Sequence, residues 1–269
     1  MRLFASGLLL TCVSFAGCSL MLGPMIEGSG NLTTETRSMG EFDHVGVAGA
    51  GEFVINVGDE HLASLTYDDN LMEHVITELD GSQLEIRQDG RLSSKHGLKG
   101  ELVVEQLRGI SIAGSGEVTV PYLHTDEFEI AIAGSGSIRA NGYGDTLEIG
   151  IAGSGDVDLS ELQVRKAVIE VAGSGDVKVF ATEEVDIKIM GSGDVVVFGP
   201  AKISKTVMGS GDITQQEKTP TEVPVLTEPG PVTSPSDEIE VIEPSDSTEQ
   251  ETESADPVIE PAAPEGESN

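Results

Sequence analysis

The sequence predicts an all-β protein of the parallel, right-handed β-helix (β-solenoid) class, in which successive turns of the chain stack along one axis. Three observations support this prediction. A glycine-rich phrase recurs at a nearly constant interval, β-branched residues alternate with polar ones around it, and length varies only between the repeated units. Self-similarity at a period of about 20 residues is typical of stacked repeats rather than of one compact globule.

The repeated phrase is a Gly-Ser-Gly corner. Its first glycine recurs at positions 114, 134, 153, 173, 191 and 209, so the steps are 20, 19, 20, 18 and 18 residues. Glycine supplies backbone angles that other residues avoid, and it lets adjacent corners approach closely. We therefore expect the corners of successive turns to lie next to one another.

Strands are predicted on both sides of each corner. Two residues before the first glycine stand Ile112, Ile132, Ile151, Val171, Ile189 and Val207, and two residues after the second glycine stand Val118, Ile138, Val157, Val177, Val195 and Ile213. Alternation of β-branched and polar residues with period two indicates strands with one buried face. An antiparallel meander with Gly-Ser-Gly hairpin turns is the alternative. Stacking of identical residues in register favours the helix.

The repeat has irregular ends. Gly49-Ala50-Gly51 resembles a corner, and the 65 residues from Gly49 to Gly114 leave room for about three further turns. Nine or ten turns would give a rod on the order of 45 Å long. At the other end, Lys205 occupies a position that is isoleucine in the earlier repeats. This polar residue indicates that the last turn is a cap or is frayed.

The N-terminus carries an export signature. Residues 1–17 read as a signal peptide, with Arg2 followed by an apolar stretch and small residues. Phe15-Ala16-Gly17-Cys18 resembles a bacterial lipobox, which predicts a lipidated Cys18 and a tether over residues 18–36. Ordinary signal cleavage that leaves a free thiol is the alternative. Since no other segment is apolar enough to span a bilayer, attachment to a membrane is expected only through Cys18.

The folded region is predicted to cover residues 37–213 and a disordered tail residues 214–269. From Gln215 to Asn269 the chain has 15 Asp and Glu against one Lys, together with nine of its twelve prolines. Such a composition cannot form a core. The net charge of −32 over the whole chain argues against nucleic acid as a partner.

No catalytic residues or cofactor motif can be assigned. The five histidines are scattered, and no nucleophile elbow, cysteine–histidine pair or Walker loop is present. The corner acids form the interesting set, namely Asp156, Asp176, Asp194 and Asp212, with Glu117 and Glu52 at earlier corners. Stacked carboxylates could hold Ca²⁺. We expect instead that each Asp is solvated or binds amides of its own corner, so that no metal site is predicted.

These residues also carry a family resemblance. Phe42-Asp43-His44-Val45, the Gly49 corner, Asp69-Asn70-Leu71 and the Gly-Ser-Gly-Asp ladder resemble the head GIN domain family, which is described as the head of autotransporter adhesins. The likeness extends from about Arg37 to Ile213. It implies a β-helical domain of envelope proteins with no established activity, and the family offers no catalytic residues to carry over.

Three functions follow as hypotheses. The first is an envelope-anchored, non-catalytic lipoprotein, exported and held at the outer membrane, whose rod binds a surface protein or a glycan in the manner of an adhesin. The second is a structural spacer without a specific ligand. The third is a carbohydrate-active enzyme on a β-helix, which is disfavoured because such enzymes need clustered acids and bases and polyanion lyases need basic residues. The rod has few Lys and Arg and only three Tyr. Seven Phe, three Tyr and no Trp offer little material for a sugar-binding platform.

Overall fold

The computed structural model describes residues 24–217, and almost all regular structure in them is β-strand. The first part contains β1 (Met25–Glu27), β2 (Leu32–Ser38), β3 (His44–Gly49), β4 (Glu52–Val57), β5 (Leu62–Asp68), the 3₁₀ turn η1 (Met72–His74), β6 (Val75–Asp80), β7 (Gln83–Gln88), β8 (Arg91–Ser93) and β9 (Lys99–Val104). The second part contains β10 (Gly109–Gly114), β11 (Glu117–Gly134), β12 (Ser137–Gly153), β13 (Asp156–Gly173), β14 (Val177–Gly191), β15 (Val195–Phe198), β16 (Lys202–Gly209) and β17 (Ile213–Gln216). Within residues 24–217, no helix has the length and apolar character needed to cross a membrane.

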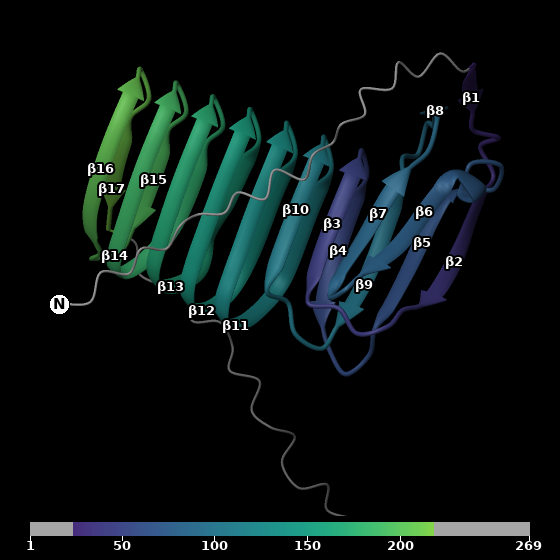
Figure 1. Cartoon of the computed structure of the whole chain (residues 1–269), viewed down its shortest axis with the longest axis horizontal. Helices are drawn as coiled ribbons and strands as arrows, with labels where there is room; N and C mark the ends of the chain where they lie inside the picture. The colour runs from purple at the N-terminus through teal and green to yellow at the C-terminus, as the bar shows by residue number, and fades with distance from the viewer. Residues whose placement is uncertain (1–23, 218–269) are drawn as a thin grey trace, which may run out of the picture. The chain divides into compact units, whose positions relative to one another are not determined.

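The second part is a parallel β-solenoid. Its strands lie side by side in one row (Figure 1), and each of β11, β12 and β13 carries the chain from one corner to the next. Ile149 of β12 pairs with Ile130 of β11 and with Ile169 of β13, and Ile169 pairs with Ile187 of β14. The predicted parallel stacking is therefore confirmed, and the antiparallel meander is wrong.

In the later corners both glycines are required by the close approach of the previous turn. Gly173 has φ +144°, and a Cβ added there would lie 1.9 Å from the carbonyl oxygen of Gly153. A Cβ added at Gly175 would lie 2.1 Å from the carbonyl oxygen of Gly155. Real Cβ atoms do not approach backbone oxygen so closely, so side chains are excluded from both positions.

The core consists of columns of aliphatic side chains that run along the solenoid. Ile149, Ile169 and Ile187 form one such column and are almost completely buried, as the sequence predicted. Burial of each of these side chains contributes roughly 1.5–3 kcal/mol to stability. Successive turns are thus held together by the same contact repeated once per turn.

The region between Gly49 and Gly114 differs from the prediction. Gly49 of β3 pairs directly with Gly114 of β10, so the expected three further turns are not present between them. The intervening chain adds parallel strands beside the first corner, since β7 pairs with β3 and β9 pairs with β4. It also forms the antiparallel pairs β5–β9 and β6–β7, and β5 pairs with the preceding strand β2. One cause is the two-residue loop Gly81-Ser82, in which a leading glycine with φ +62° favours a hairpin.

Part of the predicted tether is also folded. Strand β2 pairs with β5 in antiparallel register, from Leu32 opposite Asp68 to Ser38 opposite Leu62. Residues 24–36 therefore contribute the strand β1 and most of β2, and the tether prediction needs correction there. The segment has few apolar residues because β2 is largely exposed, and its sequence consequently lacks the pattern of a buried strand.

At the other end, β16 pairs only with β14 and β17 only with β15 among the described residues. Lys205 of this last turn is exposed, whereas its partner Ile187 is buried. Strand β17 extends to Gln216, three residues beyond the predicted end of the folded region. The predicted signal peptide, Cys18 and residues 218–269 of the tail lie outside the described residues.

Candidate functional site

The corner acids form a ladder of hydrogen bonds. The backbone N–H of Asp176 donates to Oδ1 of Asp156 at 3.1 Å, and the N–H of Asp212 donates to Oδ1 of Asp194 at 2.8 Å. The first regular corners lack this link, because Glu117 and Ser137 donate their N–H groups to the carbonyl oxygens of Gly51 and Gly116. The carboxylates of Asp156, Asp176 and Asp194 therefore each bind the amide of the following turn. The expected bond to an amide of its own corner is not the one formed.

The free energies of the hydrogen bonds and of the charge repulsion favour a structural role for this ladder. A hydrogen bond to a charged group contributes about 1.5–3 kcal/mol, at the low end when exposed. Repulsion between two carboxylates one turn apart costs roughly 1 kcal/mol in water. The hydrogen bond thus offsets the repulsion that stacking of like charges creates.

The two earlier corner acids pair with cations. Oε1 of Glu117 lies 2.8 Å from Arg139, and Oε2 of Glu52 lies 3.1 Å from Lys99. In residues 24–217, no group of three or more His, Cys, Asp or Glu side chains is arranged to hold a metal ion. The calcium alternative at Asp156, Asp176, Asp194 and Asp212 therefore gains no geometric support from the described residues.

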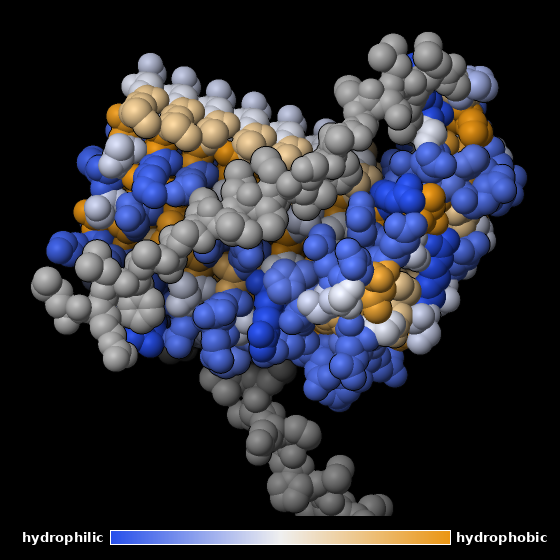
Figure 2. Space-filling view, viewed as in Figure 1, coloured by the Kyte–Doolittle hydropathy of each residue, from blue (hydrophilic) through white to orange (hydrophobic). Residues whose placement is uncertain are grey.

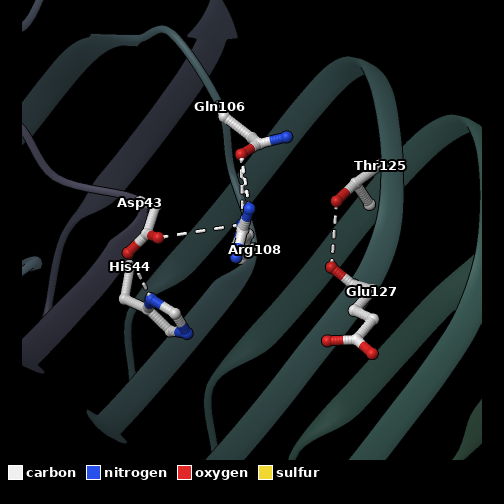
Figure 3. Close-up of polar contacts among 6 residues, drawn as sticks. All are labelled: Asp43, His44, Gln106, Arg108, Thr125 and Glu127. Atoms are coloured by element: carbon white, nitrogen blue, oxygen red, sulfur yellow. Dashed lines mark hydrogen bonds and ion pairs between the residues drawn. The ribbon is translucent and has the colours of Figure 1, made fainter.

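A second polar cluster lies where the chain enters and re-enters the solenoid (Figure 3). Asp43 accepts a hydrogen bond from Nδ1 of His44 at 2.6 Å and lies 3.8 Å from Nε of Arg108. The guanidinium of Arg108 also donates to Oε1 of Gln106, and its backbone N–H donates to the carbonyl of Asp43 at 2.7 Å. Burial acts to raise the pKa of Asp43, but hydrogen bonds from His44 and Ser82 and the charges of His44 and Arg108 lower it overall.

This cluster does not have the order of a hydrolytic triad. In a triad the histidine lies between the serine and the acid, so that it can take the proton of the serine. Here the carboxylate of Asp43 accepts from both Ser82 and His44. The cluster instead joins β3 to the segment before β10, and no local pattern predicts this, because Asp43 and Arg108 are far apart in the sequence.

A surface depression adjoins this cluster. Its lining includes Glu41, Phe42, His61, Ser82 and Glu105. His61 packs edge-on against Phe42 at a centroid distance of 5.2 Å, and its Nε2 lies 4.0 Å from Glu105. With several carboxylates in its lining, the depression can attract a cation-bearing group.

A third polar group joins β5 to the N-terminal strands. Asp68 is almost fully buried and accepts hydrogen bonds from the hydroxyl of Ser94 and from the N–H of Gly30, the latter at 2.7 Å. The bond from Ser94 is the main cause that lowers the pKa of Asp68, against the opposing effect of burial. Next to it, Ser29 donates its backbone N–H to Asn70. Gly28-Ser29-Gly30 thus serves as an anchoring loop.

Outward side chains form straight rows along the solenoid. Equivalent positions pair in register from turn to turn, and one row, here called the apolar row, consists of Ala113, Ala133, Ala152, Ala172, Met190 and Met208. Met190 and Met208 are 54% and 61% exposed. Figure 2 shows this row as a band of hydrophobic colour along one edge of the stacked strands.

The family comparison covers most of the folded region. A family model described as "Putative auto-transporter adhesin, head GIN domain" (DUF2807) matches residues 41–201. No curated protein matches the chain.

Several solved structures resemble the chain, and it spans the whole length of each. A "putative lipid binding protein" from Parabacteroides distasonis ATCC 8503 has TM-score 0.52 and 25% identity over 72% of this chain and 100% of its own. A "putative adhesin" from Bacteroides fragilis NCTC 9343 has TM-score 0.55 and 21% identity over 71% of this chain and 100% of its own. A "putative adhesin" from Parabacteroides merdae ATCC 43184 has TM-score 0.50 and 18% identity over 73% of this chain and 100% of its own. The similarity to these two adhesin structures concerns the fold alone.

Proposed function

Because the chain belongs to the head GIN domain family, we propose that it is a non-catalytic, adhesin-like binding module of the cell envelope that recognises a protein or a glycan on another surface. The description of the family as an adhesin head supports the class of function. Its partner is inferred from the surface of the solenoid.

One observation carries the proposal, namely the rows of outward side chains. Since each row repeats one position at every turn, the solenoid presents the same chemistry again and again at a spacing of about 4.8 Å. In the apolar row this chemistry is methyl and thioether groups, which end with the exposed Met190 and Met208. Rigid extended surfaces of this kind are how solenoid proteins bind their partners.

Lipidation of Cys18 would place this surface at a membrane. The expected acyl chains would supply the apolar attachment. Replacement of Cys18 by Ala should then move the protein from the membrane fraction to the soluble fraction of an expressing bacterium. If the distribution between fractions is unchanged, lipidation is not what holds the protein.

The binding function can be tested with the purified mature chain on beads. Beads that carry the folded chain should retain cells or purified surface polymers more strongly than beads that carry the chain unfolded by Ile169→Asp, whose core column is disrupted. Equal retention by both preparations, or none by either, would favour the structural-spacer alternative. Release of reducing sugar from the polymers would instead support the enzyme alternative.

A further inference from the structure

Two of the three tyrosines of the chain lie exposed on adjacent turns of the solenoid. Tyr122 is 39% exposed and Tyr143 is 36% exposed, whereas Tyr67 is buried. Both exposed residues belong to the return bends, where β11 and β12 turn at the edge opposite the Gly-Ser-Gly corners (Figure 1). His124 of β11 pairs in register with Tyr143 of β12.

The register extends this pair into a small grid. Leu123, Gly142 and Leu162 pair in sequence and are buried, so the residues that flank them along each strand point outward. The outward residues are Tyr122 and His124 on β11, Asn141 and Tyr143 on β12, and Glu161 and Gln163 on β13. We call these six residues the return-bend patch.

The backbone beneath the patch is tightly constrained. Gly142 has φ +128°, and a Cβ added there would lie 2.0 Å from the carbonyl oxygen of Leu123. The glycine therefore allows the bend of β12 to lie directly against that of β11. This contact holds Tyr143 beside His124 on a rigid support.

Most polar groups of the patch have no partner in residues 24–217. Within the described residues, the side chains of Tyr122, His124, Asn141, Tyr143 and Gln163 make no hydrogen bond or ion pair. Elsewhere on the solenoid, outward charged groups are commonly paired, as Arg139 is with Glu117 and Lys188 with Glu170. The patch thus combines exposed aromatic faces with unused amide, imidazole and phenol groups.

We propose that the return-bend patch binds a neutral oligosaccharide, an inference that rests on the proposed adhesin-like function and assigns its ligand class. The apolar faces of sugar rings pack against aromatic side chains, and their hydroxyls exchange hydrogen bonds with amides and phenols. Turns lie about 4.8 Å apart, close to the width of one sugar ring, so neighbouring units can meet neighbouring turns.

The charge of the chain and the small size of the return-bend patch favour a neutral oligosaccharide over an acidic polysaccharide or a folded protein. Of the six side chains only Glu161 carries a formal charge at neutral pH when histidine is neutral, and the whole chain has a net charge of −32, which disfavours acidic polysaccharides. Stable protein interfaces bury about 800 Å² on each partner and involve some 20–30 residues. A patch of six side chains fits a few sugar units better than it fits a folded protein.

The test uses the full-length mature chain and a panel of neutral oligosaccharides, with hyaluronate and heparin as acidic comparisons. At least one neutral oligosaccharide should bind, with a dissociation constant of about 1 mM or below. Combined Tyr122→Ala and Tyr143→Ala should weaken this binding about tenfold or more. The matched control, Leu79→Ala with Val168→Ala at two similarly exposed apolar residues outside both the patch and the apolar row, should leave it unchanged.

A second measurement covers the case in which the tyrosine variant is poorly folded. The chain has no Trp and only three Tyr, so its intrinsic tyrosine fluorescence reports mainly on the patch and Tyr67. Addition of the bound oligosaccharide to the unaltered chain should change this fluorescence, and the exposed rings should be shielded from acrylamide quenching.

The outcomes separate this inference from the proposed function. Loss of sugar binding in the control variant but not in the tyrosine variant overturns the patch and leaves the adhesin-like function in place. The same holds if the chain retains cells or surface proteins while no neutral oligosaccharide binds, or if only the acidic polymers bind. If neither cells nor polymers nor sugars bind, the proposed function fails together with the inference.

Discussion

The backbone N–H of Asp194 donates a hydrogen bond to Oδ1 of Asp176, one turn earlier in the chain, at a distance of 3.0 Å. The same link joins Asp176 to Asp156 and Asp212 to Asp194. A row of like charges, which stacking alone would destabilise, therefore connects each turn to the next. The acidic corners therefore contribute hydrogen bonds that hold neighbouring turns together.

Removal of one acceptor from the ladder should weaken the solenoid. Asp176→Ala is expected to lower the free energy of unfolding by about 1 kcal/mol, because the amide of Asp194 loses its partner. Asp176→Asn keeps an oxygen at the same place and should cost less. Denaturant unfolding of both variants measures the difference. An alanine variant as stable as the parent would show that the bond contributes nothing.

Salt should act on the ladder by screening alone. Because the Asp176 and Asp194 carboxylates already accept amide hydrogen bonds, Na⁺ and Ca²⁺ at matched ionic strength should raise the melting temperature by similar small amounts. A specific site would instead show a larger rise with calcium by mass action. A calcium-specific rise that disappears in the Asp176→Asn and Asp194→Asn double variant would contradict this expectation.

The buried column predicts a sharp contrast between two substitutions. Ile169 is completely buried between Ile149 and Ile187, so Ile169→Asp should unfold or fray several turns. Ile169→Val, which removes one methylene group, should cost only about 0.5–1.5 kcal/mol. Ser174→Ala at an exposed corner should be nearly silent. Thermal melts that tolerate Ile169→Asp as well as Ser174→Ala would contradict the stacked core.

Two glycines allow the cost of backbone strain to be measured separately from the cost of a steric clash with the neighbouring turn. Gly173→Ala would combine positive φ with a Cβ 1.9 Å from the carbonyl of Gly153, whereas a Cβ at Gly30 (φ +84°) meets nothing within 4 Å. Gly30→Ala should therefore cost about 1–2 kcal/mol from the backbone alone. Gly173→Ala should cost clearly more, as measured by chemical denaturation. Equal costs would mean that adjacent corners separate without penalty.

The carboxyl of Asp68 should make stability depend on acid pH. Its pKa is lowered below the ordinary value of 3.8, chiefly by the hydrogen bond from Ser94. A lowered pKa means that the contribution is fully present above the unfolded-state pKa and is lost as pH falls through the folded-state pKa. Asp68→Asn should flatten the decline of melting temperature below about pH 4. A parallel decline in both proteins would contradict this assignment.

Some features of the fold could not be predicted from the sequence and were seen only in the three-dimensional structure. Asp43 and Arg108 meet because the excursion between Gly49 and Gly114 returns to the neighbouring position of the solenoid. The excursion combines parallel strands with the antiparallel pairs β5–β9 and β6–β7. Its apolar pattern resembles that of further turns because alternation with period two is common to parallel and antiparallel strands. The strand β2 was not predicted, since an exposed edge strand needs no apolar face.

The sequence by itself determined the parallel solenoid, its aliphatic columns and the glycines at its corners, because each depends on contacts that recur at every turn and leave a periodic trace. Only the tertiary structure decided which amide each corner acid binds and that Tyr122, His124 and Tyr143 share one surface. The first depends on how adjacent corners meet, and the second depends on the register between neighbouring turns at the return bends, where the repeat changes length. A shift of one residue there would turn each side chain from one face of the strand to the other.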